Sequence, residues 1–232
     1  MKSLILSDIH LGSLLFNGER FLIELLDHEY KEVYILGDIL DVWVDKLDNI
    51  KNKYGELIHA INLKATRCPV IIVRGNHDPE LSILKQIFYN CEVNNTCKIT
   101  KDSIYIHGNQ FDEFIIQYSY LANFLYRIHL IGERFGLNIR EYFRKLFFSI
   151  SSKRDKDYYN DLVLDIERAA YNKYRDSYKN IIMGHTHLPK IVSYPYFGNI
   201  RRYINSGDWI HSMSYVLYDN ITDSFNLYKG II

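Results

Sequence analysis

Short runs of apolar and mostly β-branched residues recur along the chain, and a cluster of polar residues follows each of them. The runs occupy residues 4–6, 33–36, 70–73, 104–106 and 181–183, and they lead to Asp8, Gly37, Gly75, His107 and Gly184. Continuous apolar runs of this length predict strands that are buried on both faces. Each polar cluster therefore follows the carboxyl end of a strand, which is the edge where open α/β sheets bind ligands.

The remaining pattern predicts one domain over residues 1–232 that carries a helical insertion. Strands at 3–7, 32–36 and 69–74 alternate with helices near 19–29 and 52–64, as in parallel βα units. Segments at 190–195, 201–206, 213–218 and 223–229 alternate in polarity and are separated by turn residues, which predicts antiparallel strands. Between 111 and 179 the periodicity is helical and proline is absent. We therefore expect an α/β core with a helical lid at 111–179.

Composition indicates the cellular compartment and the size class of the protein. The 232 residues can bury a sizeable core, and 28 basic residues balance 28 acidic ones, so net charge directs no partner. Cys68, Cys91 and Cys97 are odd in number and lack C-x-x-C spacing, which argues against a disulfide framework and against a thiolate zinc site. No apolar stretch is long enough to span a bilayer, and the first strand leaves no room for a signal peptide. These features favour a cytoplasmic protein.

The polar clusters contain residue types that suit a pair of divalent metals. Two metals about 3.5 to 4 Å apart need a shared anionic ligand and flanking oxygen and nitrogen donors. Asp38 is the natural bridge, and residues two apart in an extended segment point the same way. Singly, each such residue is more often a turn former, and the glycines beside them are expected to form tight turns. The candidate ligands are Asp8, His10, Asp38, Asn76, His107, His185 and His187.

The ordered set D-x-H, G-D-x-x-D, G-N-H-D, H-G and G-H-T-H resembles the calcineurin-like metallophosphoesterase family. The resemblance covers residues 3 to about 110 and 180 to 210. It implies a four-layer αββα sandwich and a metal-dependent phosphoric ester or pyrophosphate hydrolase. It also implies a first metal held by Asp8, His10 and His187, a second held by Asn76, His107 and His185, and Asp38 between them. His77 matches the residue that stabilises or protonates the leaving group, and Asp41 matches the carboxylate that pairs with it.

The donor types also bear on the metal and the reaction. Carboxylate, amide and imidazole donors without thiolate suit Mn²⁺, with Fe or Zn²⁺ as alternatives. Metal binding lowers the pKa of water towards 7 and neutralises phosphoryl oxygens, so a nucleophile exists at neutral pH. A scaffold that keeps the fold and loses the chemistry is the contrary hypothesis. Such scaffolds typically lose ligands, whereas every ligand position is filled here.

Three further segments, at 37–43, 107–112 and 205–209, look like one branch of the family. Members of that branch hydrolyse UDP-2,3-diacylglucosamine in the lipid A pathway, giving UMP and a 2,3-diacylglucosamine 1-phosphate. Two positions depart from it. Asn109 stands where aspartate is usual, and His77 stands where the best-known pyrophosphatase motif has arginine. A phosphodiesterase or nuclease of the same family, acting on nucleotides or nucleic acid, therefore stays open as the alternative.

The insertion carries eight basic residues against three acidic ones between 114 and 156, interleaved with aromatic residues. Such a segment can contact anionic headgroups and acyl chains, which predicts peripheral contact with the inner face of a membrane. Arg127, Arg134 and Arg140 are the candidates for binding a nucleotide-sugar lipid substrate. An ordinary amphipathic hairpin packed on the core fits the same pattern. Nucleic acid could use these charges as well, although we do not expect it as a partner.

Overall fold

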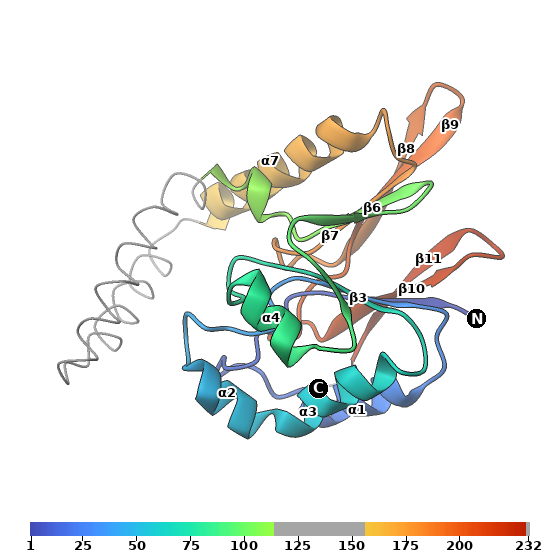
Figure 1. Ribbon diagram of the computed structural model, residues 1–232. Coiled ribbons are helices and arrows are strands. Elements are labelled where there is room, and N and C mark those ends of the chain that lie inside the picture. Colours follow the sequence, from blue (N-terminus) through green and yellow to red (C-terminus); the bar gives the residue numbers. More distant parts are fainter. Residues whose placement is uncertain (114–155, 231–232) are drawn as a thin grey trace. The chain divides into compact units, whose positions relative to one another are not determined.

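The computed structural model describes residues 1–113 and 156–230 (Figure 1). Two compact units are present, one formed by Met1–Gly108 with Tyr171–Ile232 and the other by Asn109–Ala170. The second unit contains the short 3-10 helix η1 (Asn109–Phe111) and most of helix α7 (Lys156–Tyr174). Arg127, Arg134 and Arg140, together with most of the predicted lid, lie outside the described residues. None of the helices in the described ranges is both long and apolar enough to cross a membrane.

Two sheets form the first unit. The helices that accompany them are α1 (Glu19–Asp27), α2 (Leu47–Lys53), α3 (Gly55–Lys64) and α4 (Leu81–Ile87). One sheet has six strands in the order β11-β10-β1-β2-β3-β4 and the other has five in the order β5-β6-β7-β9-β8. The strands are β1 (Ser3–Leu6), β2 (Val33–Leu36), β3 (Val70–Val73), β4 (Glu92–Asn94), β5 (Cys97–Ile99), β6 (Ser103–Ile106), β7 (Asn180–Met183), β8 (Lys190–Tyr196), β9 (Asn199–Asn205), β10 (Ser214–Asp219) and β11 (Ser224–Lys229).

Alternate residues of the central strands enter two different cores. In β1, Leu4 and Leu6 pack towards the helices, whereas Ile5 packs between the sheets. Ile182 and Ile204, from β7 and β9, belong to the same core as Ile5. Both faces of each strand are thus apolar, which explains the uninterrupted hydrophobic runs, and each fully buried side chain contributes about 1.5–3 kcal/mol. The predicted α/β sandwich of two sheets with helices is confirmed.

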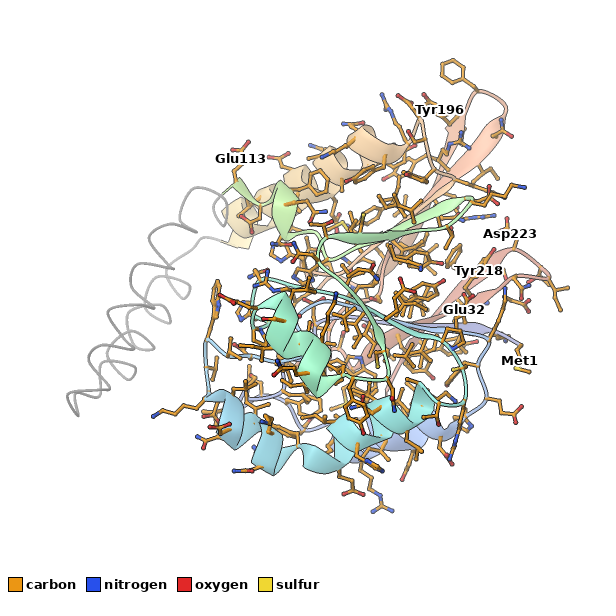
Figure 2. The ribbon with its side chains drawn as sticks, in the orientation of Figure 1. Met1, Glu32, Glu113, Tyr196, Tyr218 and Asp223 are labelled. Atoms are coloured by element: carbon orange, nitrogen blue, oxygen red, sulfur yellow. The ribbon has the colours of Figure 1, made fainter. Side chains whose placement is uncertain are left out.

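The parallel strands all direct their carboxyl ends to one edge. β1, β2, β3 and β4 are mutually parallel, and β6, β7 and β9 are parallel in the second sheet. Glu32, Tyr218 and Asp223 lie towards the opposite edge (Figure 2). Glu32 accepts a hydrogen bond from Tyr34 at 2.8 Å, and Asp223 accepts one from Tyr218 at 3.2 Å. The predicted antiparallel strands are confirmed for the β8–β9 and β10–β11 pairs.

The sequence pattern misplaced some of the helical and strand boundaries. The predicted helix near 52–64 is confirmed as α3, but it begins later than predicted, because Tyr54 leaves the helical conformation (φ −112°, ψ 26°) between α2 and α3. Helix α4 and strands β4 and β5 were not predicted at all. They contain seven, three and three residues, which is too short for a periodic pattern to emerge.

Candidate metal centre

The predicted ligands stand on the loops that follow β1, β2, β3, β6 and β7, and five of them adopt an unusual backbone conformation. Positive φ angles occur at Asp8 (53°), His10 (54°), Asp38 (50°), His185 (66°) and His187 (58°). A left-handed conformation costs a residue with a side chain of order 1 kcal/mol or more. Such strain persists where the surrounding structure fixes it, and it concentrates at functional sites.

The loops after β1 and β2 are tied to each other by backbone hydrogen bonds. Asp8 N–H donates to the Gly37 carbonyl at 3.1 Å, and His10 N–H donates to the Asp38 carbonyl at 2.8 Å. Leu11 N–H continues the ladder to the Ile39 carbonyl at 2.8 Å. These bonds hold the strained residues in place, so that the side chains of both loops face one point.

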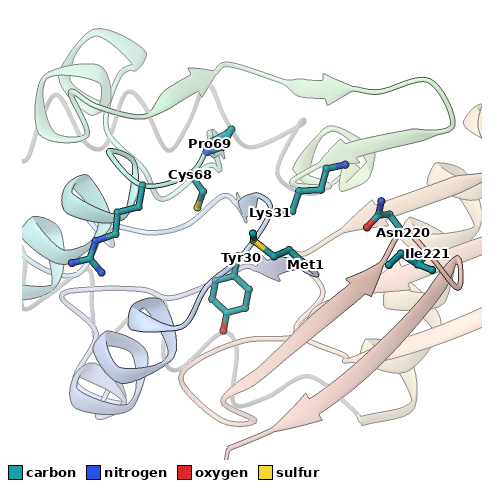
Figure 3. Close-up of a pocket in the computed structure, with 8 residues that line it drawn as sticks. Met1, Tyr30, Lys31, Cys68, Pro69, Asn220 and Ile221 are labelled. Carbon is teal, nitrogen blue, oxygen red and sulfur yellow. The ribbon is translucent and has the colours of Figure 1, made fainter.

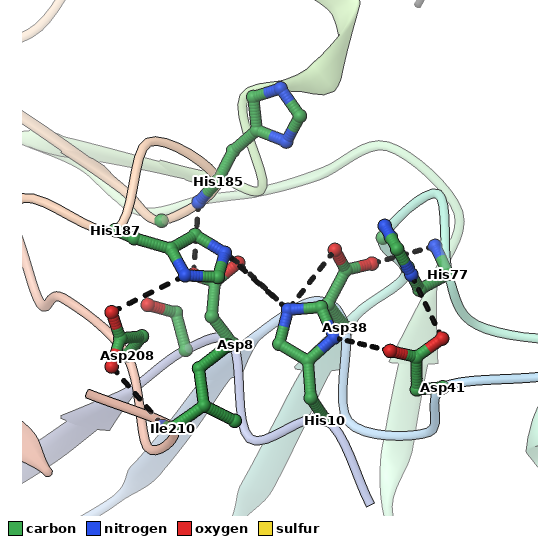
Figure 4. Close-up of polar contacts among 12 residues, drawn as sticks. Asp8, His10, Asp38, Asp41, His77, His185, His187, Asp208 and Ile210 are labelled. Atoms are coloured by element: carbon green, nitrogen blue, oxygen red, sulfur yellow. Dashed lines mark hydrogen bonds and ion pairs between the residues drawn. The ribbon is translucent and has the colours of Figure 1, made fainter. Parts of the chain in front are cut away.

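One group of converging donors consists of Asp8, His10 and His187 (Figure 4). The Nε2 atom of His187 lies 3.3 Å from Asp8 Oδ1 and 3.4 Å from His10 Nε2. Asp8 Oδ1 is buried and accepts no hydrogen bond within the described part of the chain. A buried carboxylate oxygen without a hydrogen bond is costly, and a cation held among these three atoms would remove that cost.

A second group consists of Asp38, His107 and His185, with the side-chain oxygen of Asn76 beside it. His107 Nε2 lies 3.2 Å from Asp38 Oδ2, 3.1 Å from Asn76 Oδ1 and 3.3 Å from His185 Nδ1. The donors are again oxygen and nitrogen, and no cysteine of residues 1–113 or 156–230 joins either group. Such a set fits divalent metals of the Mn²⁺, Fe and Zn²⁺ kind.

Asp38 stands between the two groups. Its Oδ2 atom lies 3.8 Å from His10 Nε2 and 3.2 Å from His107 Nε2, while Oδ1 accepts the backbone N–H of His77 at 2.8 Å. This is the position that a carboxylate shared by two metals requires. The structure thus brings all seven predicted ligands to one place, with Asp38 at the middle.

Hydrogen bonds to Nδ1 orient three of the imidazoles. In each case the partner is a carboxylate or a carbonyl, which can only accept, so Nδ1 carries the hydrogen and a neutral ring keeps its lone pair on Nε2. Each of these Nε2 atoms faces the centre. The pairs are His10 with Asp41 at 3.2 Å, His107 with the Leu36 carbonyl at 2.8 Å and His187 with Asp208 at 3.3 Å.

The electrostatics of the centre favour positive charge. Burial raises the pKa of the Asp38 carboxyl, but His107 and His77 outweigh it and hold that pKa well below its usual range. Burial lowers the pKa of the two most affected histidines, yet nearby carboxylates raise it to about 9 for His107 and about 10 for His187. Buried anions at such a density need cations, which metals would supply.

His77 and Asp41 form a pair next to the centre. His77 Nδ1 donates to Asp41 Oδ1 at 3.0 Å, and Asp41 Oδ2 accepts from His10 on its other side. The Trp43 ring stacks on His77 with ring centroids 4.2 Å apart. Burial lowers the pKa of His77, but Asp38 and Asp41 outweigh it and raise that pKa. The Nε2 atom of His77 is therefore suited to carry a proton towards a bound phosphate group.

Comparison with known proteins agrees with this geometry. The model of the calcineurin-like phosphoesterase family matches residues 1–208. The chain belongs to this family. The phosphoesterase is therefore a metal-dependent hydrolase of phosphoric esters, as the sequence predicts. A protein named UDP-2,3-diacylglucosamine hydrolase from Shewanella piezotolerans is 26% identical to this chain. The alignment covers 95% of this chain and 96% of the length of that protein.

A further relative bears the same name, and one solved structure is similar to the chain over its whole length. A UDP-2,3-diacylglucosamine hydrolase from Shewanella halifaxensis is 28% identical over 95% of this chain and 96% of its own. A solved structure described as an archaeal phosphodiesterase is 15% identical, covers 99% of this chain and 100% of its own, and has a TM-score of 0.47.

Glycines beside the ligands of the phosphoesterase provide space as well as turns. A Cβ atom on Gly75 would collide with the Asp38 carboxylate, and one on Gly184 would collide with Asp8 Oδ2. Gly37 (φ 84°) has a left-handed backbone in addition, and a Cβ there would collide with the His107 ring. Tight turns alone, as the sequence predicted, therefore do not account for these glycines.

Sequence reasoning missed two buried carboxylates of the phosphoesterase that connect loops. Asp78 accepts the backbone N–H of Leu40 and of Gly75, both at 2.9 Å, and so joins the loops after β2 and β3. Burial and the nearby Asp38 charge raise the pKa of Asp78 to about 6. Asp208 is the second, and it contacts a histidine of the centre. Leu40, a partner of Asp78, and His187, a partner of Asp208, are distant from these carboxylates in the sequence, so no local pattern indicated these two contacts.

A surface cavity of about 410 Å³ lies elsewhere on the phosphoesterase (Figure 3). Met1, Lys31 and Pro69 line it, and these residues come just before β1, β2 and β3. The cavity therefore lies at the amino ends of the strands, at the edge opposite to the ligands. Cys68 also lines it, and burial raises the pKa of that thiol. Among the described residues no histidine or carboxylate belongs to the lining.

Proposed function

We propose that this chain cleaves a pyrophosphate bond with two divalent metals, most suitably Mn²⁺, at the centre around Asp38. The support is the convergence of seven oxygen and nitrogen donors there, together with the unbonded Asp8 Oδ1. The metals would lower the pKa of water towards 7 and neutralise phosphoryl oxygens. Asp8, His10 and His187 would hold one metal, Asn76, His107 and His185 the other, and Asp38 both.

The chain's own groups determine how the leaving group departs. Asp41 fixes the His77 ring by accepting from Nδ1 at 3.0 Å, and Trp43 covers one face of that ring. Burial lowers the pKa of His77, but Asp38 and Asp41 raise it, which favours a proton on Nε2. As the bond from phosphorus to the bridging oxygen breaks and the oxygen of water bonds to phosphorus, Nε2–H donates to the departing oxygen and offsets its charge.

We further propose UDP-2,3-diacylglucosamine as the substrate, giving UMP and a 2,3-diacylglucosamine 1-phosphate. The relatives from Shewanella carry that substrate in their names and align with 95% of this chain. The segments at 37–43, 107–112 and 205–209 support the same branch. Arg127, Arg134 and Arg140 of the proposed lid at 111–179 would bind this lipid, and the lid would touch the inner face of the membrane from the cytoplasm.

A second candidate function is favoured by two residues that depart from that branch. His77 replaces an arginine of the best-known pyrophosphatase motif, and Asn109 replaces an aspartate. His77 paired with Asp41 fits the general pattern of the phosphoesterase family. A phosphodiesterase or nuclease acting on nucleotides or nucleic acid would use the same centre, but it would need an open groove or a nucleobase pocket.

One assay separates these candidates. Purified protein with Mn²⁺ is incubated with UDP-2,3-diacylglucosamine, with cyclic nucleotides and with single-stranded DNA, and the products are resolved by mass spectrometry. We expect UMP from the first substrate and no turnover of the others. Cleavage of DNA alone would overturn the assignment of the lipid substrate. If the protein turned over none of these substrates, and bis-p-nitrophenyl phosphate was not hydrolysed either, the assignment as an enzyme would be overturned. Sedimentation with vesicles of anionic lipid tests the membrane contact separately.

A further inference from the structure

Asp208 follows β9 and contacts the metal centre from outside the set of predicted ligands. It is almost fully buried, with 1% of its surface exposed. Its Oδ2 atom lies 3.3 Å from His187 Nδ1, on the side of the ring away from Asp8. The next residue, Trp209, donates its backbone N–H to the Asp8 carbonyl at 3.0 Å. The loop that carries Asp208 is thus joined directly to the loop that carries Asp8.

The two oxygens of the Asp208 carboxylate have different partners. Oδ1 accepts three backbone N–H groups, from Ile210 at 3.1 Å, His211 at 2.7 Å and Ser212 at 2.9 Å. These bonds fix the orientation of the carboxylate. Oδ2 is therefore presented to His187 in a set position, and Nδ1 of the exposed His211 lies 3.6 Å from the same oxygen.

We infer that Asp208 is a positioning residue of the metal centre, which holds the His187 ring with Nδ1–H towards itself and the Nε2 lone pair towards Asp8 and His10. This inference rests on the proposed metal centre. His187 needs such help more than His107 does, because its side chain is 25% exposed whereas that of His107 is 1% exposed. Carboxylates that orient a metal-bound histidine in this way commonly contribute 10–100-fold to metal affinity.

An asparagine at this position distinguishes positioning from support of the loop. In Asp208→Asn, the amide oxygen must stay with the three backbone N–H groups, because the NH₂ group cannot accept from them. The NH₂ group then faces His187 Nδ1 and donates to it. This reverses the hydrogen bond, moves the ring hydrogen to Nε2 and removes the lone pair from the centre, while the loop keeps its bonds.

The experiment compares Mn²⁺ affinity by calorimetric titration in the wild type, Asp208→Asn and Asp223→Asn. Asp223 is the matched control, since it pairs with Lys179 and Arg202 at 2.7 and 2.9 Å and lies away from the centre. We expect Asp208→Asn to weaken one Mn²⁺ site by about 10–100-fold, with the Tm of the chelator-treated protein unchanged. Asp223→Asn should bind Mn²⁺ like the wild type.

A double-mutant cycle with His187→Ala tests whether Asp208 acts through this histidine. If it does, Asp208→Asn causes no further loss of Mn²⁺ affinity in the His187→Ala background. An equal loss in both backgrounds, or wild-type affinity in Asp208→Asn alone, would overturn the inference. A wild-type protein that binds no Mn²⁺ would overturn the proposed metal centre instead, so the two failures are distinguishable.

Discussion

His10 and His187 are 177 residues apart in the sequence, yet their Nε2 atoms lie 3.4 Å from each other. Each ring has its Nδ1 atom next to a carboxylate, Asp41 for His10 and Asp208 for His187. Burial lowers the pKa of His187, but nearby carboxylates raise it to about 10, so without a metal this ring holds a proton that faces Asp8 Oδ1 and His10. A metal cation would take the place of that proton, and the Nε2 lone pairs of both rings would coordinate it.

Metal binding should stabilise the fold, because the donors are assembled only in the folded chain. At a free Mn²⁺ concentration 100 times the Kd, one site contributes about 2.7 kcal/mol. For a chain of this length we expect the Tm to rise by roughly 5–10 °C relative to protein in EDTA. Differential scanning calorimetry measures this shift. The Asp38→Ala variant should lose most of the shift and all activity, and a full shift in that variant would contradict the shared position of Asp38.

Removal of His77 should affect chemistry more than metal binding. We expect His77→Ala to lower kcat by about 10²- to 10⁴-fold on a substrate with a poor leaving group, the range for a lost general acid. The loss should be smaller with a p-nitrophenyl ester, because nitrophenolate departs without a proton. Steady-state kinetics on both substrates measure the difference, and His59→Ala, on the exposed face of α3, is the control. Equal losses on both substrates would argue against the acid role.

The apolar runs and the residues that follow them were enough to predict the strands that bear the ligands. A strand that is buried on both faces has an unbroken run of apolar residues in the sequence, and the first polar residues after the run indicate where the strand ends. The short elements α4, β4 and β5 lack such a signal. Their positions depend on contacts such as the pairing of β3 with β4, which a local pattern does not contain.

The candidate ligands were also predictable from their residue types and their order in the sequence. The hydrogen bonds that hold these ligands in position were not predictable. The left-handed backbone of Asp8 and Asp38 depends on hydrogen bonds between loops about 30 residues apart in the sequence. The contact between Asp208 and His187 likewise joins two loops that are distant in the sequence. Sequence therefore indicates which groups do the chemistry, and tertiary hydrogen bonds determine how those groups are oriented.

Gly75 should tolerate no side chain, although it lies outside the hydrophobic cores. A methyl group there collides with the Asp38 carboxylate, so Gly75→Ala should displace Asp38 and weaken Mn²⁺ binding at least tenfold. Gly55→Ala is the matched control, because a Cβ at Gly55 in α3 meets no atom within 4 Å and alanine favours helices. Calorimetric titration with Mn²⁺ compares the two variants. Unchanged Mn²⁺ affinity in Gly75→Ala would show that the position of the Asp38 carboxylate does not depend on the missing side chain at Gly75.

Cys91 should be slow to react at mildly alkaline pH. Burial raises the pKa of this thiol to about 12, and the thiolate is the reactive form. With an ordinary pKa near 8.5, the thiolate fraction at pH 8 would be about a thousandfold larger. We therefore expect the alkylation rate of Cys91, followed by peptide mass spectrometry with iodoacetamide, to keep rising tenfold per pH unit up to pH 10. The same peptide in guanidinium is the control and should level off near pH 9. A plateau near pH 9 in the folded protein would contradict the burial of this thiol.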